Sequence, residues 1–316
     1  MKQFSIFIFL LAALSGMAQQ EAHFTHFMFN QQYLNPAFVG SRNTGSFTGI
    51  HRSQWIGFEG APTSQILSFQ TPVMKSRAGV GGMIRRTSIG ITNDWAMTGA
   101  YSYNIRLTQK WDLRLGMHAA LKYFGIEFDS PDAVTEQPND PSLNDGEFRD
   151  KYTANVGIGM YLKFQDYFYF GLSSPFIYPN EIGFNDLSSF TAEVEQHRYL
   201  MGGGAIPVSA QFELMPNFLI KWVDNAPIGL DLNLSIRYMK KVMAGLTYRP
   251  GGNGTGESVD ALLFFQFGQK FGAGLGYDLT LSDVRDYQSG SIEVMLRYDL
   301  RDEKGNLENP RYFKKK

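Results

Sequence analysis

The chain has 316 residues and no cysteine, which excludes a disulfide framework and every cysteine-ligated metal site. A formal net charge of −1 excludes a global basic field for nucleic acid. Only 19% of the residues are charged, against about 25% in soluble domains. The chain also contains 33 glycines, 26 Phe, 16 Tyr and 4 Trp. This composition favours many strands joined by tight turns.

The first 18 residues have the pattern of a secretory signal peptide. Lys2 precedes an apolar run over residues 4–14, and Gly16 and Ala18 stand at the key positions of a cleavage site. The alternative is a buried first helix, but nothing amphipathic continues the run. We therefore expect residues 1–18 to be a signal peptide and the protein to be exported.

Strict alternation of apolar and polar residues predicts strands along most of the remaining chain. In residues 228–238, Ile, Leu, Leu, Leu, Ile and Tyr alternate with Gly, Asp, Asn, Ser and Arg, a period of two that no helix shows. The clearest runs are longer than the roughly five or six residues of globular strands and match the about 9–11 of membrane strands. The predicted strands are 45–55, 62–71, 78–88, 95–106, 110–124, 151–163, 167–173, 198–207, 211–222, 228–238, 241–249, 258–268, 270–280 and 291–300.

Alternation alone fits either a soluble β-protein or a barrel whose apolar face meets lipid. The predicted connections distinguish the two. The long connections 125–150, 174–197 and 250–256 all follow odd-numbered strands, whereas connections such as 108–109 are short and follow even-numbered strands. Short turns at one end and longer loops at the other are typical of outer-membrane barrels, and aromatic residues near strand ends suit interfacial belts.

We therefore predict an all-β fold, a single transmembrane antiparallel β-barrel of about 14 strands and outer-membrane type, over residues 45–300. An N-terminal extended, plug-like segment (19–44) precedes it, and a periplasmic C-terminal tail (301–316) follows it. The location is the cell outer membrane, with outer-membrane lipid around the barrel. Polar residues on the alternating face are expected to face the lumen: Asp112, Arg114, His118, Lys122, Asp231, Asn233, Arg237, Glu293, Arg297 and Asp299.

No pattern of catalytic or metal-ligating residues emerges. His23 and His26 form an H-x-x-H on a segment that has no matching second ligand pair nearby. The glycine-rich run 251–256 lacks the Lys-Ser/Thr of a phosphate loop, and the acidic run 129–150 lacks the calcium-loop pattern. We expect no enzymatic activity, no metal and no cofactor.

The most distinctive sequence is His26-Phe-Met-Phe-Asn-Gln-Gln-Tyr-Leu-Asn-Pro-Ala-Phe-Val-Gly-Ser41, followed by Arg52-Ser-Gln54-Trp55 and a Gly-Ala-Pro at 60–62. This combination resembles the entry signature of the PorP/SprF family of type IX secretion proteins from Bacteroidota. Weaker matches follow in order along the chain, at 101–103, 171–173, 276–278, 290–293 and 310–313. The family's closing aromatic is here followed by three lysines, 314–316, which is a mild departure.

The resemblance implies an outer-membrane barrel without enzymatic activity that assists type IX export. Family members act either as a general component touching periplasmic parts of the machine or as the receiver of the C-terminal targeting domain of a surface adhesin, a role that extends to gliding motility. The alternative function is a passive or hydrophobic-solute channel, because fourteen-stranded barrels also serve fatty-acid uptake.

The pair Asn35-Pro36 breaks a strand ladder, so residues 19–44 cannot span the membrane as a strand. Our hypothesis is that residues 27–40 pack within or beneath the barrel and, with the R-x-Q-W element, shape a partner site; the alternative is a plug that only stabilises the barrel. The partner-binding candidates are Phe27, Asn30, Tyr33, Asn35, Pro36, Gly40, Arg52, Gln54 and Trp55. Basic residues at the predicted short turns, such as Lys240 and Lys241, would face an acidic or lipoprotein partner in the periplasm.

Overall fold

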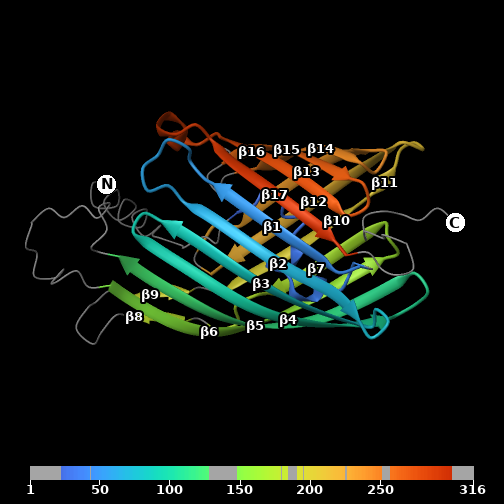
Figure 1. Cartoon of the computed structure of the whole chain (residues 1–316), viewed down its shortest axis with the longest axis horizontal. Helices are drawn as coiled ribbons and strands as arrows, with labels where there is room; N and C mark the ends of the chain where they lie inside the picture. The colour runs from blue at the N-terminus through green and yellow to red at the C-terminus, as the bar shows by residue number, and fades with distance from the viewer. Residues whose placement is uncertain are drawn as a thin grey trace, which may run out of the picture.

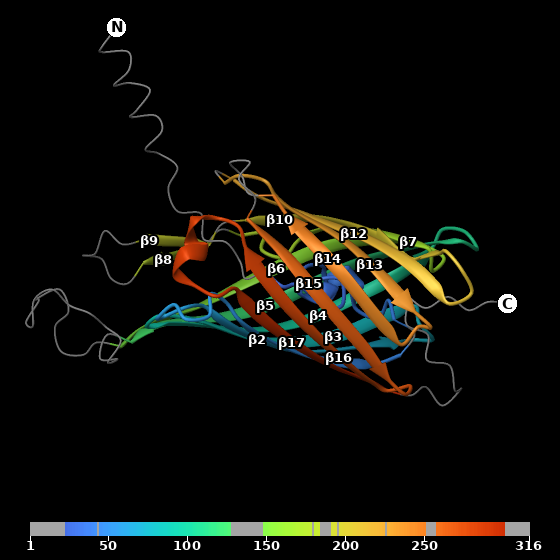
Figure 2. The same ribbon diagram turned by 90° about the horizontal axis from the view of Figure 1, so that it is seen from above.

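A computed structural model describes residues 23–42, 44–127, 148–178, 180–183, 191–194, 196–224, 226–250 and 257–300. These residues form a closed antiparallel β-barrel with 14 strand positions (Figures 1 and 2). The acidic run 129–147, the glycine-rich run 251–256, the predicted signal peptide 1–18 and the tail 301–316 lie outside the described residues. The predicted fold class is confirmed.

The barrel strands follow one another around the wall in chain order. They are β1 (Ser46–Ser53), β2 (Thr63–Val73), β3 (Ala78–Ile89), β4 (Thr92–Arg106), β5 (Trp111–Glu127), β6 (Phe148–Phe164), β7 (Phe168–Ser174), β10 (His197–Gly204), β11 (Ile206–Pro207), β12 (Phe212–Val223), β13 (Gly229–Tyr238), β14 (Val242–Arg249), β15 (Ser258–Phe267), β16 (Phe271–Thr280) and β17 (Ser291–Asp299). A separate hairpin, β8 (Asn180–Gly183) with β9 (Thr191–Val194), extends beyond the barrel at one end (Figure 1).

The barrel closes where its first and last strands pair. Ser46 of β1 lies opposite Asp299 of β17, and Ser53 lies opposite Ile292. On the far side, β10 pairs with both β7 and β12, so the long connection that contains β8 and β9 leaves no gap in the wall. Closure satisfies the backbone groups that a free sheet edge would expose to lipid.

Most strand ends lie within two residues of the sequence-based prediction, and the clearest differences concern β4, which begins at Thr92, the β5–β6 pair and the predicted strand 198–207. The β5–β6 pairing continues to Glu127 opposite Phe148, well beyond the predicted strand ends, because the two chains remain hydrogen-bonded past the apolar alternation. The predicted strand 198–207 is interrupted at Ala205, whose N–H donates to the Tyr167 carbonyl of a neighbouring turn. β10 and β11 therefore share one strand position.

The outer wall of the barrel is apolar, and its inner wall is polar. Outward side chains such as Leu67, Leu121 and Leu296 are 58%, 66% and 63% exposed, while inward side chains such as Asp260 and Glu293 are 0% exposed. A soluble barrel would show the reverse, so this surface fits a lipid environment. No helix of the described residues is long and apolar enough to cross a membrane.

Aromatic pairs mark the end of the barrel at which the turns are short. Trp111 pairs with Phe164, and Phe271 with Tyr298, at ring-centroid distances of 4.7 and 4.9 Å across neighbouring strands. These pairs form part of the expected interfacial belt. Trp55 does not belong to it, because it lies in the β1–β2 loop and faces a cavity instead of lipid.

Residues 23–42, which we call the plug, lie inside the barrel (Figure 2). Every residue from Phe24 to Arg42 is buried. Instead of running fully extended, the plug folds into two short 3-10 helices, η1 (Gln31–Tyr33) and η2 (Pro36–Phe38), with Asn35 capping the second. The side chain of Asn35 accepts a hydrogen bond from the Ala37 N–H at 2.9 Å. These turns make the plug compact enough to fill the barrel interior.

Candidate functional site

Glycines on the inner wall make room for the plug. A Cβ at Gly116 of β5 would lie 2.3 Å from the Ala37 nitrogen, and a Cβ at Gly159 of β6 would lie 2.1 Å from Asn35 Oδ1. Such distances are too short for any real side chain. The wall therefore matches the plug in shape, and no larger residue at either glycine would admit η2 in its present place.

The same part of the plug hydrogen-bonds to the wall. Asn35 Nδ2 donates to the Met160 carbonyl at 2.9 Å, and Gln70 Oε1 accepts from the Gly40 N–H at 2.7 Å. Gly40 has a φ of +70° and approaches Gly79 so closely that a Cβ on it would lie 2.4 Å from the Gly79 Cα. Asn35 thus supplies a hydrogen bond that this wall needs, and Gly40 allows an approach to the wall that is too close for a larger residue.

The beginning of the plug is held by one buried carboxylate. Glu293 of β17 accepts hydrogen bonds from the N–H groups of Thr25 and His26 at 2.8 and 2.9 Å, and it contacts His26 Nδ1 at 2.7 Å. The side chains of Glu293 and His26 are both 0% exposed. Arg52 of β1 donates to Thr25 Oγ1 at 3.1 Å and lies 3.5 Å from Glu293. We call this set of contacts the latch.

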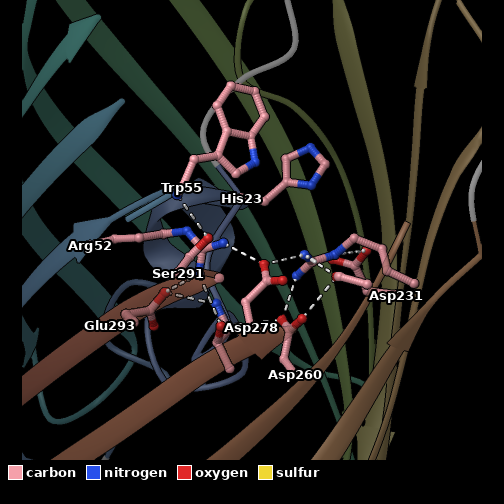
Figure 3. A network of polar contacts seen from close by, with 12 residues as sticks. His23, Arg52, Trp55, Asp231, Asp260, Asp278, Ser291 and Glu293 are labelled. Carbon is pink, nitrogen blue, oxygen red and sulfur yellow. Dashed lines mark hydrogen bonds and ion pairs between the residues drawn. The ribbon is translucent and has the colours of Figure 1, made fainter. Parts of the chain in front are cut away.

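The latch belongs to a larger cluster of buried charges (Figure 3). Arg52 pairs with Asp278 of β16 at 2.7 Å. Arg249 of β14 lies 3.1, 2.8 and 3.4 Å from Asp231, Asp260 and Asp278. An unpaired buried charge costs roughly several kcal/mol. Each charged side chain in the cluster therefore needs its neighbours to offset the cost of its burial.

Lys221 of β12 completes the cluster and links it to the plug. Its ammonium group lies 2.9 Å from Asp231 and 3.2 Å from His23 Nδ1. Burial lowers the pKa of His23 well below its ordinary value, and the positive charges of Lys221 and Arg249 lower it further. The neutral imidazole is therefore favoured at the entrance to the plug.

A second charged group anchors the other end of the plug. Arg42 donates to the Phe29 carbonyl at 3.1 Å and lies 3.5 Å from Asp299. Asp299 also pairs with Arg297 at 3.0 Å, and the Arg297 guanidinium lies 4.9 Å from the centre of the Phe264 ring. The plug is thus tied to the wall near its beginning, its middle and its end.

Above the charge cluster, at the end of the barrel where the connections are long, is a cavity of about 380 Å³ that we call the vestibule. Its lining residues are His23, Arg52, Gln54, Trp55, Pro62, Ser64, Thr87, Ile89, Arg249, Glu257, Ser258, Asp278, Thr280 and Ser282. The rings of Trp55 and His23 stand above the charged residues (Figure 3). Trp55 has a left-handed backbone, φ +50°, and its N–H donates to Ser291 Oγ at 3.3 Å.

The partner-binding candidates are not gathered in one place. Phe27, Asn30, Tyr33, Asn35, Pro36 and Gly40 are buried in the barrel interior, whereas Gln54 and Trp55 line the vestibule and the buried Arg52 contributes to its floor. Asn35 and Pro36 lie against β5 and β6, while Arg52 to Trp55 extend from β1. A partner that approaches from the long-loop end can meet Trp55 without moving the plug, but not Asn35.

The inward-facing candidates lie on the inner wall, and four of them, Asp231, Glu293, Arg297 and Asp299, belong to the charged groups described above. Arg114, His118, Lys122, Asp231, Asn233, Arg237, Glu293, Arg297 and Asp299 are buried. Asp112 lies at the short-turn end, where its side chain is 35% exposed and 3.8 Å from Arg106. His118 contacts the Pro175 carbonyl at 2.8 Å, and Arg237 pairs with Glu213.

Several residues of the charge cluster were absent from the sequence-based candidates, namely Lys221, Arg249, Asp260 and Asp278. All four sit on the polar face of an alternating strand, which is the signal that would have identified them. Among the described residues, no group of three or more His, Asp or Glu is placed to hold a metal ion.

Comparisons with known proteins agree with this architecture. The family model described as "Type IX secretion system membrane protein PorP/SprF" matches residues 16–298. No curated protein matches the chain. Among solved structures, a TodX deltaS2S3 mutant monoaromatic hydrocarbon channel is 11% identical over 85% of this chain and 94% of its own, with a TM-score of 0.50. The Ralstonia pickettii toluene transporter TbuX is 8% identical over 86% and 92%, with a TM-score of 0.49. At such low identity, the match to the TodX mutant indicates a shared barrel fold only.

Proposed function

The chain belongs to the PorP/SprF family of type IX secretion system membrane proteins, and from this we propose that it is an outer-membrane scaffold that assists export or surface attachment of a partner protein. The partner we favour is an adhesin-type cargo with a C-terminal targeting domain. In this proposal the short-turn end of the barrel contacts periplasmic parts of the secretion machine.

The observation that carries the proposal is the filled interior. The plug is held at its beginning by Glu293, in its middle by the Gly116 and Gly159 surfaces, and at its end by Asp299. A route for solute or unfolded chain through the barrel would require all three attachments to release. A scaffold that presents its two ends to other proteins requires none of them to move.

This argument separates the proposal from the alternative of a channel. The vestibule lies near the long-loop end, and buried plug residues lie below it. The purified barrel in a planar lipid bilayer should therefore show little or no steady conductance. A stable, open conductance of porin size would favour the channel and contradict the scaffold.

The cellular test is deletion of the gene followed by comparison of the surface and secreted proteomes. We expect loss of one or a few surface proteins that carry a type IX targeting domain, with restoration by the wild-type chain. Complementation with an Asn35→Ala, Pro36→Ala variant should restore export poorly even where the barrel accumulates normally, because loss of the Asn35 bonds to Met160 and Ala37 loosens the plug that keeps the scaffold in one shape. An unchanged surface proteome, together with altered uptake of apolar solutes, would contradict the proposal.

If the protein is a scaffold, basic residues at its short-turn end should contribute to binding periplasmic machine components. Lys240 and Lys241 are exposed in the β13–β14 turn. Replacing both with Glu should reduce co-purification of periplasmic machine components by reversing the local charge. The matched control is charge reversal at the long-loop end, Arg285→Glu, which should leave that co-purification unchanged.

A further inference from the structure

The vestibule has the features of a binding site for a small polar ligand. Its volume of about 380 Å³ falls within the roughly 300–1,000 Å³ typical of small-molecule sites. Its floor carries the buried side chains of Arg52, Arg249 and Asp278, and its rim carries an aromatic ring, Trp55. A buried charged floor below an aromatic rim provides both orientation and contact area for a ligand.

Some polar groups of the vestibule lack partners. Asp278 Oδ1 and Arg52 Nε have no hydrogen-bond partner in the described part of the chain. Glu257 lines the cavity and forms no ion pair with any described residue. Since buried polar groups are normally hydrogen-bonded, the two unsatisfied atoms leave the floor of the vestibule short of hydrogen-bond partners.

The pattern of charge on the lining selects the chemistry of that ligand. An anion would meet the carboxylates of Glu257 and Asp278, and a cation would meet the guanidinium groups of Arg52 and Arg249. A hydroxyl group both donates and accepts a hydrogen bond, so it can satisfy either kind of neighbour. A neutral polyhydroxyl compound therefore fits the lining better than any simple ion.

Trp55 narrows this class to saccharides. Its left-handed backbone (φ +50°) is fixed by the hydrogen bond to Ser291, and the next residue, Ile56, donates from its N–H to the Gly290 carbonyl at 2.8 Å. The indole ring contacts Phe58 edge-on, at a ring-centroid distance of 6.3 Å. An indole offers a flat apolar face with one polar edge, which suits the apolar C–H face and the hydroxyl edge of a pyranose ring.

We propose that the vestibule binds a saccharide, with Trp55 stacked on a pyranose ring and Arg52, Asp278 and Glu257 hydrogen-bonded to its hydroxyl groups. The site is independent of the proposed role in export, because it needs no cargo and no periplasmic partner. The sugar has two possible sources, a free saccharide and the glycan part of a lipid in the same membrane leaflet, and both present the same hydroxyl chemistry.

The test is saturation-transfer NMR on the full chain in lipid nanodiscs. The probes are the methyl glycosides of glucose, galactose, mannose and N-acetylglucosamine. A further probe is the core oligosaccharide released from the lipopolysaccharide of the bacterium that naturally makes the protein. We expect transfer to at least one probe. Strongest transfer to the core oligosaccharide identifies the lipid glycan as the source, and strongest transfer to a simple glycoside identifies a free saccharide.

Variants determine whether binding occurs in the vestibule. Trp55→Ala should weaken binding at least about tenfold, as expected for loss of a central aromatic contact, and Trp55→Phe should recover part of it. Glu257→Gln should weaken it less. The matched control is Trp95→Ala, because Trp95 lies on the outer wall at 43% exposure. Heat-modified migration in gels verifies that each barrel is folded. No transfer to any probe, or equal binding by wild type and Trp55→Ala, would overturn the proposal.

Discussion

Replacing Glu293 with alanine should detach the beginning of the plug and leave the barrel wall in place. Glu293 accepts hydrogen bonds from two plug N–H groups at 2.8 and 2.9 Å, contacts His26 Nδ1 at 2.7 Å and lies 3.5 Å from Arg52. Breaking a buried ion pair by removing one partner costs about 3–5 kcal/mol. This cost already includes the two backbone N–H groups that lose their acceptor, because water can hydrogen-bond to them once the plug moves. The local opening free energy should thus fall by at least about 3 kcal/mol.

Hydrogen exchange measured by mass spectrometry on the protein in nanodiscs tests this value. A loss of 3 kcal/mol corresponds to exchange roughly 100-fold faster in peptides covering residues 23–30, because each 1.4 kcal/mol is about tenfold. Peptides from β15 to β17 should change much less, since the strand ladder remains closed. Conductance of the same variant in planar bilayers should stay low, because the plug remains attached in its middle and at its end.

Glu213→Ala is the matched control for Glu293→Ala. It also removes a buried carboxylate that is paired with an arginine, Arg237, but this pair joins β12 to β13 near the short-turn end, away from the latch. Exchange in residues 23–30 should therefore stay at the wild-type rate. The reasoning on the latch is refuted if Glu293→Ala leaves exchange of the plug unchanged, or if Glu213→Ala accelerates it equally.

The remaining predictions concern the wall, the charge cluster and the middle of the plug. Gly159→Ala should displace Asn35 and cost about 1–3 kcal/mol by overpacking, seen as a lower thermal midpoint, whereas Gly99→Ala on the outer wall, where a Cβ meets nothing within 4 Å, should be neutral. Arg249→Met leaves three carboxylates without their shared cation and should cost about 3–5 kcal/mol in urea unfolding. Ser173→Ala removes the hydrogen bond of 2.8 Å to the Leu34 carbonyl and should accelerate exchange around residue 34 only modestly, by about tenfold.

The strands could be predicted from the sequence because lipid and lumen impose opposite requirements on alternate residues. In β13, Leu232, Leu234 and Ile236 are exposed to the outside, while Asp231, Asn233 and Ser235 are buried within. A period of two follows directly from that alternation. The short connections could be predicted as well. The turn expected between strands 228–238 and 241–249 is indeed short, because only residues 239–241 join β13 to β14.

The path of the plug could not be predicted in the same way, because it has no period. Its burial depends on contacts far apart in the chain, such as Thr25 with Glu293 and Asn35 with Met160. The glycines of β16 supplied a hint: alternation placed Gly274 and Gly276 on the inner face, where they now lie against His26 and Thr25. That pattern predicts that something packs against the wall there, but not which segment does so.

The pairing of inner-wall charges also explains why the interior holds a segment of its own chain and not water alone. Four carboxylates, Asp231, Asp260, Asp278 and Glu293, face three cations, Arg52, Lys221 and Arg249. The plug supplies further donors, because His26 and two backbone N–H groups meet Glu293. Without the plug, the wall would keep a buried carboxylate with too few donors, and without the wall the plug would lose the acceptor of its Thr25 and His26 N–H groups. The plug and the wall therefore stabilise each other, so the barrel is most stable when the plug fills it. The proposed scaffold requires such a filled interior, and an open channel does not.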